Sequence, residues 1–314
     1  MEGQVLLAQA TRNGWVESVH AGHAVLIDPD GSVVRAWGRP QDPTLPRSSN
    51  KPLQATGMVG AGLGLVGAQL AIAAASHNGE QFHLDTVRAI LAEGGLSEDD
   101  LANVKALPTG AAAQAAWLRA GGGPASVTQN CSGKHAAMLR TALVMGAPTR
   151  GYLHPDHPVQ QAAAAAIERM SGERSAASGV DGCGAPVAAI SLIGLARAFS
   201  RMVLAPGDSP EGQVAAAMST HPMYVGGTDR DVTRFMMAVP GAIAKDGAEG
   251  VHVFALPDGR AGALKIADGS ERARPAVAVA LLAHLGVDQE VLDACGAAPV
   301  LGGGQPVGAI EGLI

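Results

Sequence analysis

The stretch GHAVLIDPDGSVVRAW, residues 22–37, decides the fold. Its first half is rich in β-branched and aliphatic residues, Pro29-Asp30-Gly31 has the chemistry of a tight turn, and residues 32–37 form a second extended run. The pattern recurs near the other end of the chain in GVHVFALPDGRAGALKI, residues 250–266, around Pro257-Asp258-Gly259. The sequence therefore predicts an antiparallel β-hairpin close to each terminus.

The residues between the two hairpins have the periodicity of helices. Apolar residues recur at helical spacing, with Gly-rich loops between the runs, in residues 80–92, 134–145, 158–170 and 186–202. Strands at both ends with helices between them predict an α/β (α+β) fold. One antiparallel sheet with flanking helices would be built from residues 1–65 and 241–314, and residues 66–240 would form a mainly helical inserted lobe. Together they would make a single functional unit.

The composition is typical of a globular protein with a sizeable core. Of the 314 residues, 47% are hydrophobic and 16% are charged, which excludes a disordered chain. The formal net charge of −6 and the lack of a Lys/Arg-rich run exclude nucleic acid as a partner and favour a small-molecule site. No apolar run is long enough to span a membrane, and the N-terminus lacks the pattern of a signal peptide. We therefore expect a cytoplasmic protein with no membrane partner.

Ser48-Ser49-Asn50-Lys51 has the pattern Ser-x-x-Lys where a loop leads into a predicted helix. Residues three apart share a helix face, so the Lys51 amine can reach the Ser48 hydroxyl. Serine becomes a nucleophile when a neighbouring base accepts its proton, and a neutral, buried lysine is such a base. The alternative is a helix-capping serine beside a solvated lysine, and the tetrad alone favours that alternative.

Two later segments shift the balance toward catalysis. Ala75-Ser76-His77-Asn78 offers a second serine with an asparagine two residues on, and Lys265 lies at the end of a predicted strand. The order Ser-x-x-Lys, Ser-x-Asn, strand Lys is similar to that of penicillin-recognising serine enzymes, which also combine a terminal sheet with a helical insert. The Thr-Gly that normally follows the strand lysine is absent. Motif order and architecture together favour serine amide hydrolysis.

The cysteines suggest a second constellation. Cys131 lies in Asn130-Cys131-Ser132-Gly133-Lys134-His135 at the start of a predicted helix, and Cys183 lies in the Gly-rich segment Asp181-Gly182-Cys183-Gly184. Two thiolates with an aspartate and a histidine or lysine have the ligand chemistry of tetrahedral zinc. The spacing is not that of a Cys-x-x-Cys pair, and two buried cysteines among small residues are the alternative.

These segments, taken in order, resemble one family. The resemblance is carried by Val16–His20, Arg47–Gln54, Ala75–His77, Asn130–His135, Asp156–Gln160, Asp181–Gly184 and Gly247–Gly250. Together they are similar to the bacterial L-asparaginase II family of the rhizobial type, also called class 3 asparaginases. The similarity extends from about residue 5 to residue 285. The chain departs from the family pattern at Gln129 and at residues 101–104, and neither departure removes a catalytic group.

The resemblance implies a fold like that of serine β-lactamases and glutaminases, and a homodimer that hydrolyses L-asparagine to L-aspartate and ammonia. It implies two catalytic Ser–Lys pairs, Ser48 with Lys51 and Ser76 with Lys265. It also implies a zinc ion that supports substrate binding. The ligands implied for that ion are Cys131, Lys134, Asp181 and Cys183.

We expect the substrate to be held by charges and by close backbone approach. Asp181 is expected to meet its α-ammonium group, and Arg47 or Lys134 its α-carboxylate. The residues expected to bind substrate are Arg47, Asn130, Lys134, His135, Asp181 and Gly247. The alternatives are a glutaminase, another serine amidohydrolase such as a β-lactamase or peptidase, and a catalytically silent module that binds zinc or an amino acid. Asparagine and glutamine differ by one methylene, which a pocket distinguishes by only about 1–3 kcal/mol.

Overall fold

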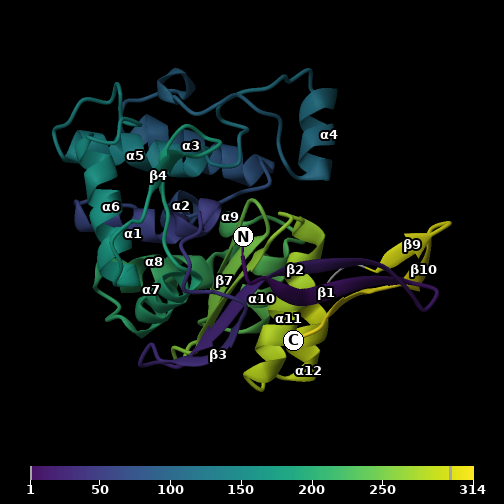
Figure 1. Cartoon of the computed structure of the whole chain (residues 1–314). Coiled ribbons are helices and arrows are strands. Elements are labelled where there is room, and N and C mark those ends of the chain that lie inside the picture. The colour runs from purple at the N-terminus through teal and green to yellow at the C-terminus, as the bar shows by residue number, and fades with distance from the viewer. Residues whose placement is uncertain (1, 297–298) are drawn as a thin grey trace.

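The computed structural model describes residues 2–296 and 299–314. Its centre is an antiparallel sheet to which both ends of the chain contribute, with strand order β11-β1-β2-β8-β7-β6 and with β3 also paired to β2 (Figure 1). These strands are β1 (Val5–Arg12), β2 (Trp15–Ile27), β3 (Val33–Trp37), β6 (Ile243–Gly247), β7 (Val251–Ala255), β8 (Ala261–Ile266) and β11 (Ile310–Gly312). The fold-class prediction of a sheet made by the terminal strands is confirmed.

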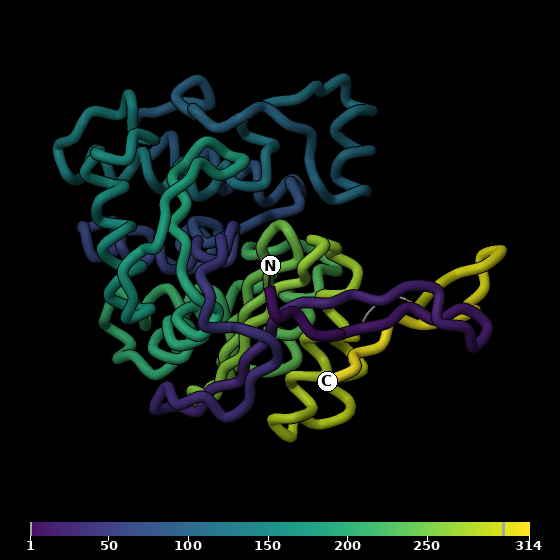
Figure 2. The backbone as a smooth tube through the Cα atoms, in the orientation of Figure 1, coloured from purple at the N-terminus to yellow at the C-terminus, as the bar shows by residue number. Residues whose placement is uncertain are grey.

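Both predicted hairpins are present. β2 pairs with β3, with Ala24 opposite Trp37, and β7 pairs with β8, with Ala255 opposite Ala261. β2 also pairs with β8, so the two hairpins lie side by side in the sheet, and Figure 2 shows the two ends of the chain meeting there. The sequence did not predict β1, β6 or β11. It also did not predict two small antiparallel pairs, β4 (Ser178–Val180) with β5 (Pro186–Ala188) and β9 (Val300–Gly302) with β10 (Gln305–Gly308).

Helices form most of the rest of the structure. They are α1 (Lys51–Gly60), α2 (Gly67–Ala73), α3 (Gln81–Glu93), α4 (Ala111–Arg119), α5 (Ser132–Val144), α6 (Pro158–Ser171), α7 (Leu192–Leu204), α8 (Pro210–Thr220), α9 (Pro222–Val225), α10 (Asp231–Ala238), α11 (Arg274–His284) and α12 (Gln289–Cys295), with 3-10 turns η1 (Arg47–Asn50), η2 (Glu98–Asp100) and η3 (Glu271–Ala273). Within the described ranges no helix is both long and apolar enough to cross a bilayer.

The core lies between the sheet and the helices. Every residue of β6, β7 and β8 is buried, and α7 and α11 both pack on β7 and β8. These strands are covered on both faces, and their residues are mostly apolar; the polar exceptions are Lys245, Asp246, His252 and Lys265. Helices α1, α2 and α5 form a second buried layer rich in alanine, which lets their backbones approach closely. The chain enters this layer through η1, which also contacts the edge strand β6.

Candidate active site

Lys51 is the centre of the candidate site. It is the first residue of α1, its side chain is wholly buried, and its Nζ lies 2.9 Å from the Ser76 hydroxyl oxygen. The same amine lies 2.7 Å from the Ala75 carbonyl oxygen and 3.0 Å from the Cys131 sulfur. Ser48 lies one turn earlier in η1 and is half-buried. The structure therefore brings the predicted base within hydrogen-bonding distance of the second serine, whereas among the described residues the Lys51 amine makes no hydrogen bond to the Ser48 hydroxyl.

A main-chain hydrogen bond of Ser76 and a side-chain contact of the neighbouring His77 hold this segment in place. The loop after α2 runs into the helical layer, where the Ser76 N–H donates to the Val225 carbonyl at 3.0 Å. The neighbouring His77 is wholly buried, and its Nε2 lies 2.9 Å from the Ser132 hydroxyl. Burial, with the charges of His83 and Lys51, holds the pKa of His77 well below its ordinary value. His77 is thus a neutral ring that packs behind the serine.

Lys265 lies in a different setting from the one expected. Its Nζ donates to the Glu249 carbonyl and, at 2.9 Å, to the Ile266 carbonyl, and within the described residues Ser76 receives its lysine contact from Lys51. Burial lowers the pKa of Lys265, although Glu249 and Asp268 favour its charged form. The Ser76–Lys265 pair stays a prediction.

The thiols of Cys131 and Cys183 lie together beneath the serines. A hydrogen bond from Cys183 to Cys131, and the charges of Lys51 and Lys134, lower the pKa of Cys131 well below its ordinary value against the effect of burial. The pKa of Cys183 is raised because it holds the shared proton and is buried. Lys134 Nζ lies 3.2 Å from the Cys183 sulfur. Burial opposes a charge on Lys134, but the nearby thiols outweigh it and raise its pKa. The two cysteine sulfurs and the two lysine amines thus form one buried cluster.

Asp181 and Arg47 form an ion pair at the rim of this cluster. Arg47 Nε lies 2.7 Å from Asp181 Oδ1, and the Gly182 N–H donates to the same oxygen at 2.9 Å. Burial works to raise the pKa of Asp181, but the hydrogen bonds from Arg47 and Gly182 and the charge of Lys134 lower it overall. One carboxylate oxygen is thus engaged by the guanidinium that precedes Ser48.

Of the remaining three predicted binding residues, Asn130 and His135 lie beside Cys131 and Lys134 in the chain, and Gly247 lies against the loop that leads to Ser48. Asn130 accepts from the Cys131 thiol group at 3.1 Å through its side-chain oxygen. His135 is wholly buried, with Nδ1 2.8 Å from the Tyr152 hydroxyl, and burial keeps the pKa of its ring well below the ordinary value. Gly247 lies where β6 meets η1: a Cβ there would be 2.5 Å from the Pro46 carbonyl oxygen.

A family comparison identifies the chain. The L-asparaginase II family model matches residues 8–312. The chain belongs to the L-asparaginase II family. No curated protein matches it significantly. Among solved structures it is similar to a β-lactamase from Mycobacterium bovis, with a TM-score of 0.46 and 17% sequence identity over 85% of this chain and 95% of that one. At that distance the similarity assigns no functional residue.

The zinc ligands implied for this family member converge only in part. Cys131, Cys183 and the Lys134 amine lie together, and two thiolate sulfurs with an amine nitrogen are donors that suit zinc, provided that the lysine is neutral. The Asp181 oxygen Oδ1 is instead engaged by Arg47. Within residues 2–296 and 299–314, no three His, Cys, Asp or Glu side chains form a group that could hold a metal ion. A zinc ion bound here would therefore need the neutral Lys134 amine as a ligand beside the two cysteines.

Sequence reasoning missed a buried ionic group behind the edge strand of this L-asparaginase II chain. Lys245 and Arg230 both pair with Asp246, and the Lys245 carbonyl accepts from the Ser49 hydroxyl at 3.3 Å. Burial lowers the pKa of Lys245 to about 8, although Asp246 favours its charged form, and the charge of Lys51 adds to the lowering. Burial opposes ionisation of Asp246, but Lys245 and Arg230 hold its pKa well below the ordinary value.

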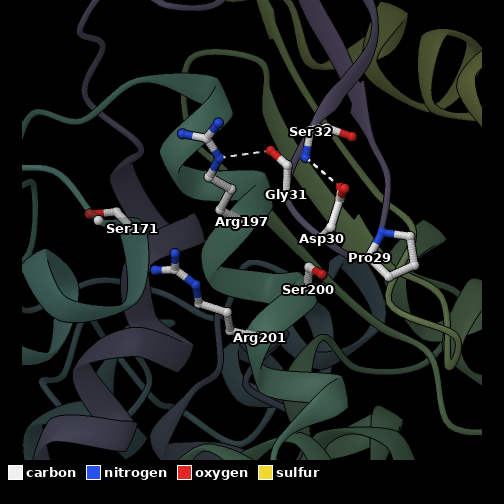
Figure 3. Close-up of a pocket in the computed structure, with 9 residues that line it drawn as sticks. Pro29, Asp30, Gly31, Ser32, Ser171, Arg197, Ser200 and Arg201 are labelled. Carbon is white, nitrogen blue, oxygen red and sulfur yellow. Dashed lines mark hydrogen bonds between the residues drawn. The ribbon is translucent and has the colours of Figure 1, made fainter.

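A polar cavity of about 420 Å³ lies away from the cluster, between the tip of the β2–β3 hairpin and α7. Arg197 and Arg201, both on α7, line this cavity (Figure 3). Arg197 Nε donates to the Gly31 carbonyl at 2.9 Å. None of the predicted site residues lines this cavity. Lys265 instead lines a smaller cavity of about 150 Å³ with His23, Arg39 and Thr44 among its neighbours.

Proposed function

We propose that this amidohydrolase hydrolyses the side-chain amide of L-asparagine to L-aspartate and ammonia, with Ser48 as the nucleophile. The observation that supports it best is the Lys51 amine, which is wholly buried one helical turn from Ser48 and within hydrogen-bonding distance of Ser76. An amine in that position can accept the Ser48 proton and pass one on through the Ser76 hydroxyl.

In the proposed reaction the Ser48 oxygen forms a bond to the amide carbon while its proton moves to Lys51, whose amine must first release its own proton to act as the base. The carbon–nitrogen bond then breaks, and the leaving nitrogen takes a proton through Ser76, so that ammonia departs and an ester remains on Ser48. Water hydrolyses the ester with Lys51 again accepting the proton, which restores the serine. Lys265 stays the expected second lysine, and its amine donates to the Glu249 and Ile266 carbonyls.

Metal and assembly remain expectations that come with the family. A bound zinc ion, held by Cys131, Cys183 and Lys134, would supply positive charge beside the substrate. Arg47, Asn130, His135, Asp181 and Gly247 would line the substrate site around the serines. A cytoplasmic location and a homodimer stay predictions.

Ammonia release from L-asparagine and from L-glutamine, with and without added zinc, tests the proposal. We expect asparagine to be the better substrate, and Ser48→Ala to reduce the rate on the order of 10⁴-fold. Ser32→Ala, an exposed serine in the turn between β2 and β3, is the matched control and should leave the rate unchanged. Hydrolysis of glutamine in preference would indicate a glutaminase. Parental activity in Ser48→Ala would contradict the nucleophile.

A further inference from the structure

Two charged residues beside Ser48 adopt the left-handed backbone region. Of the four non-glycine residues with positive φ in the described ranges, Arg47 (φ 52°) and Glu249 (φ 63°) contact one another. Such a conformation costs about 1–3 kcal/mol for a residue with a side chain, and it persists where the surrounding structure imposes it, often at functional sites. Glycine would fit both positions without strain, yet each carries a long charged side chain.

The fold holds Glu249 beside the loop that carries Ser48. Glu249 lies in the turn after β6, and Gly247, the last residue of β6, packs against the Pro46 carbonyl in the loop that leads to Ser48. The Glu249 carbonyl is bound by the Lys265 amine, which anchors this turn from the other side. The turn and the nucleophile loop therefore lie in direct contact.

The Glu249 carboxylate is free to meet a ligand. Its side chain is 63% exposed, and its oxygen lies 3.9 Å from Arg47 Nη1, a long contact that costs little to open. Across residues 2–296 and 299–314 no hydrogen bond ends on this carboxylate, whereas Asp181 already accepts from both Arg47 and Gly182. Glu249 is thus the acidic group here with both oxygens open.

We infer that Glu249 binds the α-ammonium group of the amino-acid substrate while Arg47 binds its α-carboxylate, an inference that rests on the proposed function. The two side chains carry opposite charges next to each other, as the two charged groups of a zwitterion do. Substrate then replaces a weak, exposed ion pair by two charge-assisted contacts. Arg47 directly precedes Ser48. When Arg47 and Glu249 hold the α-carboxylate and the α-ammonium group of the substrate, its side-chain amide therefore points toward the Ser48 hydroxyl. Asp181 acts as a positioning residue that holds Arg47.

The test compares L-asparagine with succinamate, the same molecule without the α-amino group. Glu249→Gln keeps the shape of the side chain and removes its charge. We expect kcat/KM for asparagine to fall about 10- to 100-fold, mainly through KM, while kcat/KM for succinamate stays unchanged. Asp181→Asn should lower kcat/KM for both substrates by a similar factor, because it releases Arg47. Glu290→Gln, an exposed glutamate on α12, is the control and should change neither.

Each outcome decides between defined alternatives. The role of Glu249 would be overturned if Glu249→Gln lowered kcat/KM equally for both substrates, or if Asp181→Asn alone lowered kcat/KM selectively for asparagine. Either result would leave the proposed function standing. A parental enzyme that hydrolyses neither substrate would overturn both. Glu249→Asn gives a second neutral variant whose side chain tolerates the left-handed backbone, and it should show the same selective loss.

Discussion

Replacing Gly247 by alanine tests whether the edge strand positions the nucleophile. The Gly247 backbone suits an L-residue, because its φ lies outside the left-handed region, so space alone decides the effect. The new methyl carbon would lie 2.5 Å from the Pro46 carbonyl oxygen and 2.9 Å from the Ser49 hydroxyl. Contacts of this kind need 3.0–3.4 Å, so β6 and η1 must separate by 0.5–0.9 Å.

That separation sets the size of the expected effect. Overpacking of this kind costs about 1–3 kcal/mol of folding free energy. A displacement approaching 1 Å at a reacting group lowers the rate about 10²-fold, because the attack geometry is lost. We therefore expect Gly247→Ala to lower kcat for ammonia release from asparagine about 10²-fold while the protein stays folded.

The assay pairs steady-state ammonia release with thermal unfolding followed by circular dichroism. Gly64→Ala is the control, because a Cβ at Gly64 meets no atom within 4 Å, and it should leave both measurements close to those of the parent. A Gly247→Ala protein with parental kcat and an unchanged Tm would refute the reasoning. It would mean that β6 and η1 separate without disturbing Ser48.

Three further predictions concern stability and metal binding. Burial lowers the pKa of His83 to about 4, so the stability that its neutral ring contributes is present above pH 6.5 and is lost as the pH falls toward 4. We expect the free energy of unfolding, measured with denaturant across that range, to fall by about 3 kcal/mol. The fall should be smaller in His83→Gln. Tyr152→Phe removes the hydroxyl 2.8 Å from His135 Nδ1 and should cost about 1–3 kcal/mol in the same measurement. Added zinc should raise the Tm of the parent and not that of Cys131→Ser; an equal rise in both would place zinc elsewhere.

The parts of the fold that were predictable depend on local sequence. Both hairpins combine extended runs with a Pro-Asp-Gly turn, and this pattern needs no knowledge of the rest of the chain. β6 escaped prediction because Lys245-Asp246-Gly247 has the composition of a turn. It becomes a buried strand because β7 pairs with it and because Arg230, which lies outside this stretch of sequence, neutralises the charge of Asp246. That compensation is tertiary and leaves no periodic signal.

In the candidate site, too, some features follow from local sequence and others depend on how distant segments pack. The spacing of Ser48 and Lys51 follows from helix geometry and could be predicted from four residues. The approach of Lys51 to Ser76 and Cys131 depends on how α1, α2 and α5 pack, so it could not be predicted from spacing. The Arg47–Glu249 contact was also out of reach, because two long side chains in strained turns give no sequence pattern.

The position of Lys265 joins the predicted chemistry to the recognition of the substrate. Its amine donates to the Glu249 and Ile266 carbonyls, so its immediate effect is to anchor the strained turn that presents the Glu249 carboxylate. If that anchoring dominates, Lys265→Met should lower kcat/KM for asparagine more than for succinamate, as Glu249→Gln does, because only asparagine carries the α-ammonium group. If Lys265 instead supplies a proton through Ser76, both substrates need that proton and both should slow equally, with kcat falling rather than KM rising. Comparing the two substrates in this one variant therefore separates the two roles of the lysine.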